Sequence, residues 1–168
     1  MQMNHKQQIH EWIKAFTPLD TVVDMTAGNG YDTLFLAQHA KHVIAIDIQE
    51  DAIIATQERC KKHDNITYQL GSNDLYKFET GVDGLVYNLG YLPGSDKSII
   101  TTAHSTVTSL KNALPFVKRF ISISCYRKHD FGDHEYHEVK AFVEDHFTNY
   151  QVLKYDTELS PVVFLISI

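Results

Sequence analysis

The sequence has few cysteines, no long apolar segment and no excess of positive charge. Its two cysteines, Cys60 and Cys125, lie far apart and form no C-x-x-C pair, so we expect buried reduced thiols and not a disulfide. No apolar run approaches the roughly 18 residues that cross a bilayer. The first residues, MQMNHKQQIHEW, contain no apolar region of the kind found in signal peptides. We therefore expect a cytoplasmic protein with no membrane partner.

The charge balance is acidic, with a formal net charge of −6. This argues against indiscriminate binding to nucleic acid, although it is compatible with a local basic face. The content of 43% hydrophobic and 21% charged residues is typical of a globular protein, and 168 residues are enough to bury a full core. Repeats, low-complexity tracts and linkers are absent, so we expect a single domain over residues 1–168, with residues 1–18 forming a helix packed on it.

Apolar periodicity predicts an alternation of strands and helices. From residue 21 to residue 147 each predicted strand is followed by a helix or by a link to the next strand, which favours an α/β fold, doubly wound and Rossmann-like, with a mostly parallel seven-stranded sheet. Only Ser160-Pro161 separates the last two strands, too little for a crossover helix, so they should form an antiparallel C-terminal edge hairpin. The predicted strands are 21–26, 42–48, 66–71, 84–90, 119–126, 150–156 and 162–168, and the predicted helices are 4–16, 31–40, 50–63, 97–113 and 134–147.

Carboxylates and glycines follow the first two predicted strands. The first strand runs into DMTAGNG, with Asp24, Thr26, Gly28 and Gly30, and the second ends in Asp47. Ligands of parallel sheets bind beyond the carboxyl ends of the strands. Glycines there let the backbone approach a ligand, and a carboxylate after the second strand can accept hydrogen bonds from both ribose hydroxyls. A lone G-x-G is compatible with a plain turn, but the complete pattern predicts a nucleoside site.

The same region narrows the choice of nucleoside. A dinucleotide fingerprint requires glycine or alanine where this chain has Thr33, and we expect no second domain to hold a hydride acceptor. The Asp24 carboxylate would be unfavourable beside a pyrophosphate, but it suits a cationic ligand such as the amino acid half of S-adenosylmethionine. Asp74, after the third strand, is a candidate partner for the adenine amino group. An equally supported alternative is that Asp74 caps a helix.

The pattern D-x-[GT]-x-G-x-G, with an acidic residue ending the second strand, resembles the class I S-adenosylmethionine-dependent methyltransferases. DMTAGNGYDTLFLA, NLGYLPGSDKSIIT and CYRKHDFGDHE are similar to the YtqB-like rRNA methylases, also called MnmM, and the similarity covers nearly the whole domain. It implies methylation of the aminomethyl group of 5-aminomethyl-2-thiouridine at the tRNA wobble position, with the anticodon loop as partner. The cofactor site would comprise Asp24, Thr26, Gly28, Asn29, Gly30, Asp47, Gln49, Asp74 and Asn88.

The third of these segments departs from the family pattern, which runs roughly Y-x-G-H-x-G-G-x-x-E. The positions that match are Tyr126, His129, Gly132 and Glu135. Lys128 and Phe131 stand where the family has glycines. This departure concerns the loop that would contact the substrate and leaves the cofactor side unaffected.

Asn88-Leu89-Gly90-Tyr91 is similar to the [ND]-P-P-[YF] loop of methyltransferases that modify amino nitrogens. An amine attacks the sulfonium methyl group in line, so oxygen atoms must hold its hydrogens. The Asn88 side-chain carbonyl and the Leu89 backbone carbonyl are suited to this. Gly90 leaves the approach open, and Tyr91 offers a ring for stacking or for a cation–π contact with the methyl donor.

An alkylamine titrates near ~10, so the site must bind the neutral amine or remove a proton, and His129 and Tyr126 are the candidates. The catalytic residues proposed on this basis are Asn88, Tyr91 and His129. The proposed substrate contacts are Leu89, Gly90, Tyr91, Tyr126, Arg127, Lys128 and His129. Lys118, Arg119, Arg127 and Lys128 form either a phosphate-contacting edge or scattered solvated charge.

Two other functions are compatible with these residues. A small-molecule amine methyltransferase would suit the acidic net charge, and a nucleoside-binding protein without catalysis would need no acceptor at Asn88. No metal site is expected, because His134-x-x-His137 is more typical of a solvated helix start. The sequence leaves open whether the protein forms a homodimer, with the apolar strand 162–168 as a possible contributor.

Overall fold

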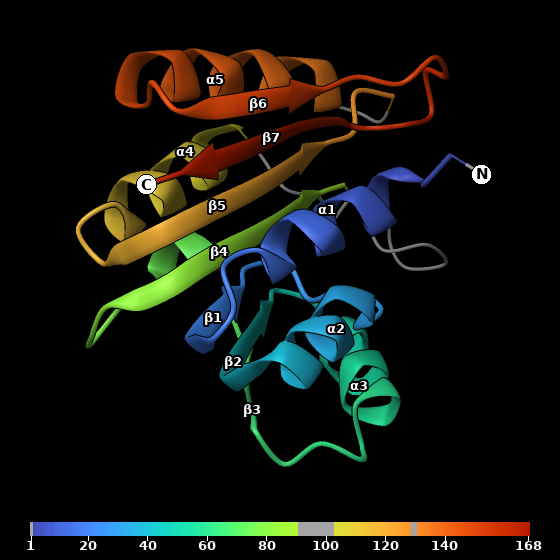
Figure 1. The fold of residues 1–168 in the computed structure, drawn as a ribbon, viewed down its shortest axis with the longest axis vertical. Coiled ribbons are helices and arrows are strands. Elements are labelled where there is room, and N and C mark those ends of the chain that lie inside the picture. Colours follow the sequence, from blue (N-terminus) through green and yellow to red (C-terminus); the bar gives the residue numbers. More distant parts are fainter. Residues whose placement is uncertain (1, 91–102, 129–130) are drawn as a thin grey trace.

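The computed structural model describes residues 2–90, 103–128 and 131–168 of the chain. These residues form a seven-stranded sheet in the order β3-β2-β1-β4-β5-β7-β6, which Figure 1 shows from β3 at the bottom to β6 at the top. Strands β1 to β5 run parallel to one another, whereas β7 is antiparallel to β5 and β6. The strands are β1 (Leu19–Asp24), β2 (Ala40–Asp47), β3 (Ile66–Leu70), β4 (Val82–Leu89), β5 (Val117–Cys125), β6 (Tyr150–Leu153) and β7 (Val162–Ser167). The predicted fold class is confirmed.

Helices cover both faces of the sheet (Figure 1). On one face, Ile9 and Ile13 of the first helix and Leu36 of the second pack against the sheet in a single buried cluster. On the other face, a second cluster joins Leu110 and Val139 of the last two helices to the sheet. The helices are α1 (His5–Lys14), α2 (Tyr31–His39), α3 (Glu50–Arg59), α4 (Ala103–Ala113) and α5 (Gly132–His146), with a 3-10 turn, η1 (Asn73–Leu75). Within the described residues, no helix is long and apolar enough to cross a membrane.

The inner strands are almost continuous runs of buried apolar residues because helices cover both of their faces. In β4 and β5, Leu85, Phe120, Ile121 and Ile123 are fully buried. The Phe120 ring lies directly over Gly84, where an added Cβ would come within 2.1 Å of a ring carbon. A glycine is therefore required at position 84, because any side chain there would displace the Phe120 ring from the core cluster that α1 covers.

The C-terminal hairpin differs in detail from the prediction. Its antiparallel pairing is confirmed, but the two-residue turn is wrong, because β6 ends at Leu153 and β7 begins at Val162, with residues 154–161 between them. The outermost strand is β6, while β7 lies between β5 and β6. Both edges of β7 are thus hydrogen-bonded within the chain, so this strand has no free edge to pair with a second copy.

The remaining differences concern the ends of elements and one short turn. Helix α1 begins after Asn4, whose side chain accepts a hydrogen bond from the Gln7 amide in a capping box. The sequence predicted no element at η1, a three-residue turn. The predicted helix 97–113 is confirmed over Ala103–Ala113, and its first six positions lie outside the described residues.

Candidate active site

The glycine turn after β1 is held between the carboxyl ends of β2 and β4. The Ala27 amide donates a hydrogen bond of 2.8 Å to the Ile46 carbonyl of β2. From the other side, the backbone amide of Asn88, in β4, donates a hydrogen bond of 2.6 Å to the Thr26 hydroxyl. These contacts bring the predicted cofactor turn and the predicted amine-binding strand end to one edge of the sheet.

Asp24 is a fully buried carboxylate at the centre of this edge. Its Oδ1 accepts a hydrogen bond from the Thr26 amide at 3.2 Å, and its Oδ2 accepts one from the Thr33 hydroxyl at 2.7 Å. Burial, with a smaller contribution from the negative charge of Asp32, raises the pKa of Asp24 to about 7. A buried carboxylate with a raised pKa is stabilised by a cation, which agrees with the predicted preference for a positively charged ligand.

Thr33 is the position at which this chain departs from the dinucleotide fingerprint. Its hydroxyl is fully buried and donates to Asp24. The threonine therefore supports the carboxylate, a role that the sequence pattern did not reveal because it counted Thr33 only as a missing glycine.

Asp47, at the end of β2, is oriented by two backbone amides. Its Oδ2 accepts from the Gly28 amide at 3.0 Å, and its Oδ1 accepts from the Gln49 amide at 2.9 Å. Burial raises the pKa of Asp47, while hydrogen bonds from Gln49, Gly28 and Ile48 oppose the shift. The three backbone hydrogen bonds leave part of the lone-pair capacity of the carboxylate unused, so Asp47 can still accept a ribose hydroxyl.

The glycine turn itself packs tightly on α3. Gly28 and Gly30 have φ angles of +57° and +87°, in the left-handed region that favours glycine. A Cβ at Gly30 would also lie 2.8 Å from the Thr56 Cα atom. The Thr56 hydroxyl donates to the Gly28 carbonyl at 3.1 Å, and Arg59 Nε donates to the Asn29 carbonyl at 2.7 Å.

Asp74 lies in η1, beyond the end of β3. Its carboxylate accepts a hydrogen bond from the Ser72 hydroxyl, and its backbone carbonyl accepts one from the Asn112 amide group at 2.9 Å. The N-cap of η1 is Ser72, so the alternative in which Asp74 is the capping residue is wrong. Asn73 ties η1 to β1 by donating to the Met25 carbonyl at 3.0 Å. The contact between Asp74 and adenine stays a prediction.

The end of β4 presents backbone and not apolar side chains to the site. The Leu89 side chain is fully buried, and its carbonyl accepts the Tyr126 amide at 3.3 Å, which leaves its second lone pair for another donor. The Asn88 side chain is half-buried. A Cβ at Gly90 would make only an ordinary contact of 3.7 Å with the Tyr126 ring. Tyr91 and His129 lie outside the described residues.

The Tyr126 hydroxyl lies 3.2 Å from Nε2 of His5, a residue of α1 that the sequence had not implicated. Burial raises the pKa of Tyr126 to about 12, and burial also lowers the pKa of His5. Tyr126 is therefore a neutral phenol at physiological pH and is unsuited to accepting a proton from an amine. His5 and Tyr126 are 121 positions apart, and no local pattern relates them.

The four basic residues of the predicted phosphate-contacting edge do not form one surface. Lys118 and Arg119 are at the beginning of β5, whereas Arg127 and Lys128 follow its end, about 26 Å away at 3.3 Å per residue. Arg127 pairs with Asp133 at 2.5 Å and Lys128 with Glu158 at 2.9 Å. The prediction of a single phosphate-contacting edge is therefore wrong, because the length of β5 separates its two pairs of basic residues.

The departure in the third motif has a conformational consequence. Phe131 precedes α5 with a φ angle of +66°, and its side chain is 69% exposed. Glu135, which matches the family, is buried and accepts a hydrogen bond from the Thr106 hydroxyl at 2.9 Å. Glu135 thereby joins α5 to α4. Among the described residues, no cluster of three or more histidine, cysteine or acidic side chains is arranged to hold a metal ion.

A doubly wound sheet with a glycine turn after β1 and a carboxylate ending β2 is the arrangement of proteins that bind a nucleoside at the carboxyl edge of the sheet. The model of the family described as "Putative rRNA methylase" matches residues 43–164, so the chain belongs to that family.

Known relatives agree with this assignment. The chain is 34% identical over 152 residues, or 78% of its length, to the chloroplastic tRNA (mnm(5)s(2)U34)-methyltransferase of Arabidopsis thaliana, and spans 55% of that protein. The crystal structure of an rRNA-methylase family protein from Clostridium thermocellum is 29% identical with a TM-score of 0.91, covering 100% of both chains. A Streptococcus mutans protein in complex with SAH is 28% identical with a TM-score of 0.86, covering 99% of both.

Proposed function

We propose that the protein transfers the methyl group of S-adenosylmethionine to the aminomethyl nitrogen of 5-aminomethyl-2-thiouridine at the tRNA wobble position. The observation that carries the proposal is the end of β4, where the backbone amide of Asn88 donates a hydrogen bond to the Thr26 hydroxyl of the cofactor turn. The Arabidopsis relative, named as a tRNA mnm(5)s(2)U34 methyltransferase, supports the choice of substrate. The reaction would take place in the cytoplasm, where tRNA is available.

The cofactor would be held by the residues that cluster around Asp24. The Asp24 carboxylate is suited to the ammonium group of the methionine part, and its raised pKa falls when a cation binds beside it. Asp47 would accept a ribose hydroxyl with the lone-pair capacity that its backbone hydrogen bonds leave unused. The other residues assigned to cofactor binding are Thr26, Asn29, Gly30, Asp74 and Asn88.

The bound cofactor supplies an electrophilic methyl group, so the protein's task is mainly to orient the amine. In the transfer, the nitrogen lone pair forms a bond to the methyl carbon while the carbon–sulfur bond breaks and its electrons pass to sulfur. The Asn88 side-chain carbonyl and the free lone pair of the Leu89 carbonyl would hold the amine hydrogens. Tyr91 would stack on the donor or substrate, and His129 would accept the proton.

The experiment is nucleoside analysis of tRNA that carries 5-aminomethyl-2-thiouridine, before and after incubation with the protein and S-adenosylmethionine. We expect the aminomethyl nucleoside to decrease as its methylaminomethyl form appears, and the Asn88→Ala protein to give much less product. Unchanged tRNA, with donor consumed when small alkylamines are supplied, would assign the protein to the small-molecule alternative. Donor that binds but is never consumed with either substrate would assign it to non-catalytic nucleoside binding.

A further inference from the structure

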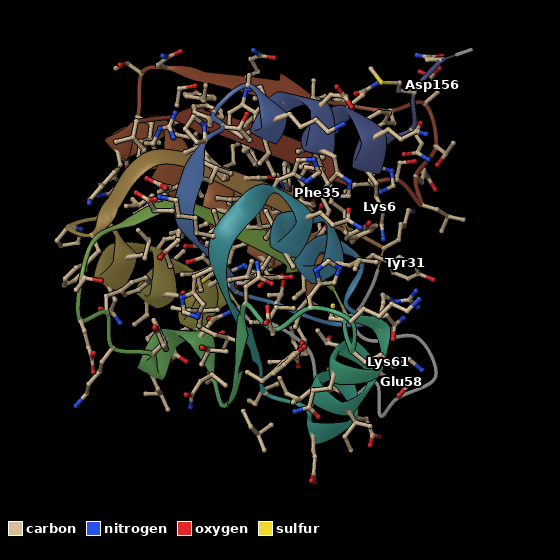
Figure 2. The ribbon with its side chains drawn as sticks, turned by 60° about the horizontal axis from the view of Figure 1, so that its bottom comes forward. Lys6, Tyr31, Phe35, Glu58, Lys61 and Asp156 are labelled. Carbon is tan, nitrogen blue, oxygen red and sulfur yellow. The ribbon has the colours of Figure 1, made fainter. Side chains whose placement is uncertain are left out.

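An exposed aromatic ring beside the cofactor turn contacts two cations. The Tyr31 side chain, at the start of α2, is 50% exposed. The Arg59 guanidinium carbon of α3 lies 3.6 Å from the centroid of the Tyr31 ring, and Lys6 Nζ of α1 lies 4.9 Å from it. Figure 2 shows Lys6 and Tyr31 next to each other at the surface. We call these three residues the Tyr31 patch.

The Tyr31 patch carries two cations, Lys6 and Arg59. Within the described part of the chain, neither Lys6 nor Arg59 forms an ion pair, and Arg59 Nε donates instead to a neutral acceptor, the Asn29 carbonyl. By contrast, Lys61, two residues after α3, contacts Glu58 at 2.8 Å, and Arg127 and Lys128 contact Asp133 and Glu158. The patch thus combines an exposed ring with free positive charge on a protein that is acidic as a whole.

The Tyr31 patch adjoins both halves of the proposed active site. Tyr31 directly follows Gly30 of the cofactor turn, and Arg59 is bonded to Asn29 of the same turn. On the other side, Lys6 follows His5, which contacts the Tyr126 hydroxyl at 3.2 Å. The Tyr126 ring in turn lies against Gly90 at the end of β4. The Tyr31 patch is thus linked by contacts to the cofactor turn and, through His5 and Tyr126, to the end of β4.

We propose that the Tyr31 patch binds the RNA backbone and one unstacked base beside the wobble uridine of the substrate tRNA. A single-stranded loop presents bases that stack on aromatic rings or on guanidinium planes, and its phosphates attract lysine and arginine. The guanidinium of Arg59, already lying against Tyr31, offers such a plane, and Lys6 supplies a charge for phosphate. This inference rests on the proposed function, and it moves RNA recognition away from Arg127 and Lys128.

The test uses an anticodon stem-loop RNA oligonucleotide, with binding followed by fluorescence anisotropy over a range of salt concentrations. Tyr31→Ala should weaken RNA binding about 5- to 100-fold, the range for loss of one stacked base, because the Tyr31 ring holds the Arg59 guanidinium that offers the stacking plane. Lys6→Glu should weaken it about tenfold or more at low salt and should reduce the slope of log affinity against log salt by roughly one phosphate contact. Tyr31→Phe, which keeps the ring, should bind as the unmodified protein does.

Lys14→Glu is the matched control, because it reverses the same charge on the same helix at a lysine that is already paired with Glu11. It should leave RNA binding nearly unchanged. Calorimetry with S-adenosylhomocysteine should give unmodified affinity for Tyr31→Ala and Lys6→Glu; a loss of cofactor affinity instead of RNA affinity would make the patch a cofactor clamp and overturn the inference.

The inference and the proposed function fail in different ways. If the unmodified protein methylates the wobble nucleoside and the patch variants bind RNA and methylate equally well, the inference is wrong while the proposed function stands. If the unmodified protein neither binds the stem-loop nor methylates tRNA, both are wrong.

Discussion

Replacing Asp24 with asparagine is expected to stabilise the cofactor-free protein at pH 8 while weakening cofactor binding. Folding raises the pKa of this carboxyl from its ordinary 3.8 to about 7. A group whose pKa is raised on folding contributes stability below its unfolded pKa, and that contribution is lost as the pH rises through the folded pKa. The ionisation of Asp24 therefore costs stability progressively between about pH 4 and pH 7. The full cost is about 4 kcal/mol at 1.36 kcal/mol per pKa unit.

Asparagine has nearly the same shape but does not ionise. Its carbonyl can keep the hydrogen bond from the Thr26 amide, and its amide group can donate to the Thr33 hydroxyl, which then accepts. We expect the Asp24→Asn protein to be about 2–4 kcal/mol more stable at pH 8, allowing about 1 kcal/mol for the altered hydrogen bond. The difference should vanish towards pH 4. Urea unfolding of the cofactor-free protein at several pH values measures this.

Cofactor binding should change in the opposite direction. An ionised Asp24 is needed to pair with the ammonium group, so the unmodified protein should bind S-adenosylhomocysteine about 20-fold more weakly at pH 5.5 than at pH 7.5. Asp24→Asn should lose about 1.5–3 kcal/mol of affinity at pH 7.5, the value of a hydrogen bond to a charged group, and should show little pH dependence. Calorimetry that found the same affinity and pH profile in both proteins would refute the assignment of Asp24 to the cofactor. Equal stability of the two proteins at pH 8 would refute the raised pKa.

Three further substitutions test other parts of the site. Asp47→Ala should weaken cofactor binding by about 1.5–3 kcal/mol in calorimetry, and unmodified affinity in a folded protein would remove Asp47 from the site. Asn88→Ala should slow methyl transfer roughly ten- to a thousand-fold in single-turnover measurements at saturating donor, and Asn88→Asp should retain more activity. An unchanged rate for Asn88→Ala would show that the Asn88 side chain has only a structural role at the end of β4. Phe131→Gly should stabilise the protein by about 1 kcal/mol in urea unfolding, because the left-handed backbone strains a non-glycine residue, and a loss of stability would show that the exposed ring has contacts that outweigh the strain.

The sheet and the first two site elements could be predicted because local sequence specifies them. Buried parallel strands are short apolar runs, and the residue that ends each run is placed at the carboxyl edge by the strand itself. Asp24, Asp47 and Asn88 were therefore located correctly at one edge before any tertiary contact was known. Parallel connectivity then leaves few ways to arrange those strand ends.

Features that depend on contacts between distant segments could not be predicted in this way. The pair formed by His5 and Tyr126 arises because α1 crosses the sheet to reach the residue after β5. The pairing of Lys128 with Glu158 depends on the path of residues 154–161, which the sequence had suggested would be a two-residue turn. The role of Thr33 was missed for another reason, since a motif compares residue identities and does not show that a hydroxyl can support a neighbouring carboxylate.

The position of β7 between β5 and β6 affects the order in which the sheet can be completed during synthesis. Because β6 bonds to the sheet only through β7, it leaves the ribosome before the strand that it must join. Until residues 162–167 emerge, the open edge of β5 and the apolar side of α5 have no permanent cover, and chains at that stage are exposed to pairing with one another. The nucleoside site is built from segments synthesised earlier, at β1, β2 and β4. A nascent chain could therefore acquire a formed cofactor site while its sheet is still incomplete, and early binding of the methyl donor would stabilise it through that interval.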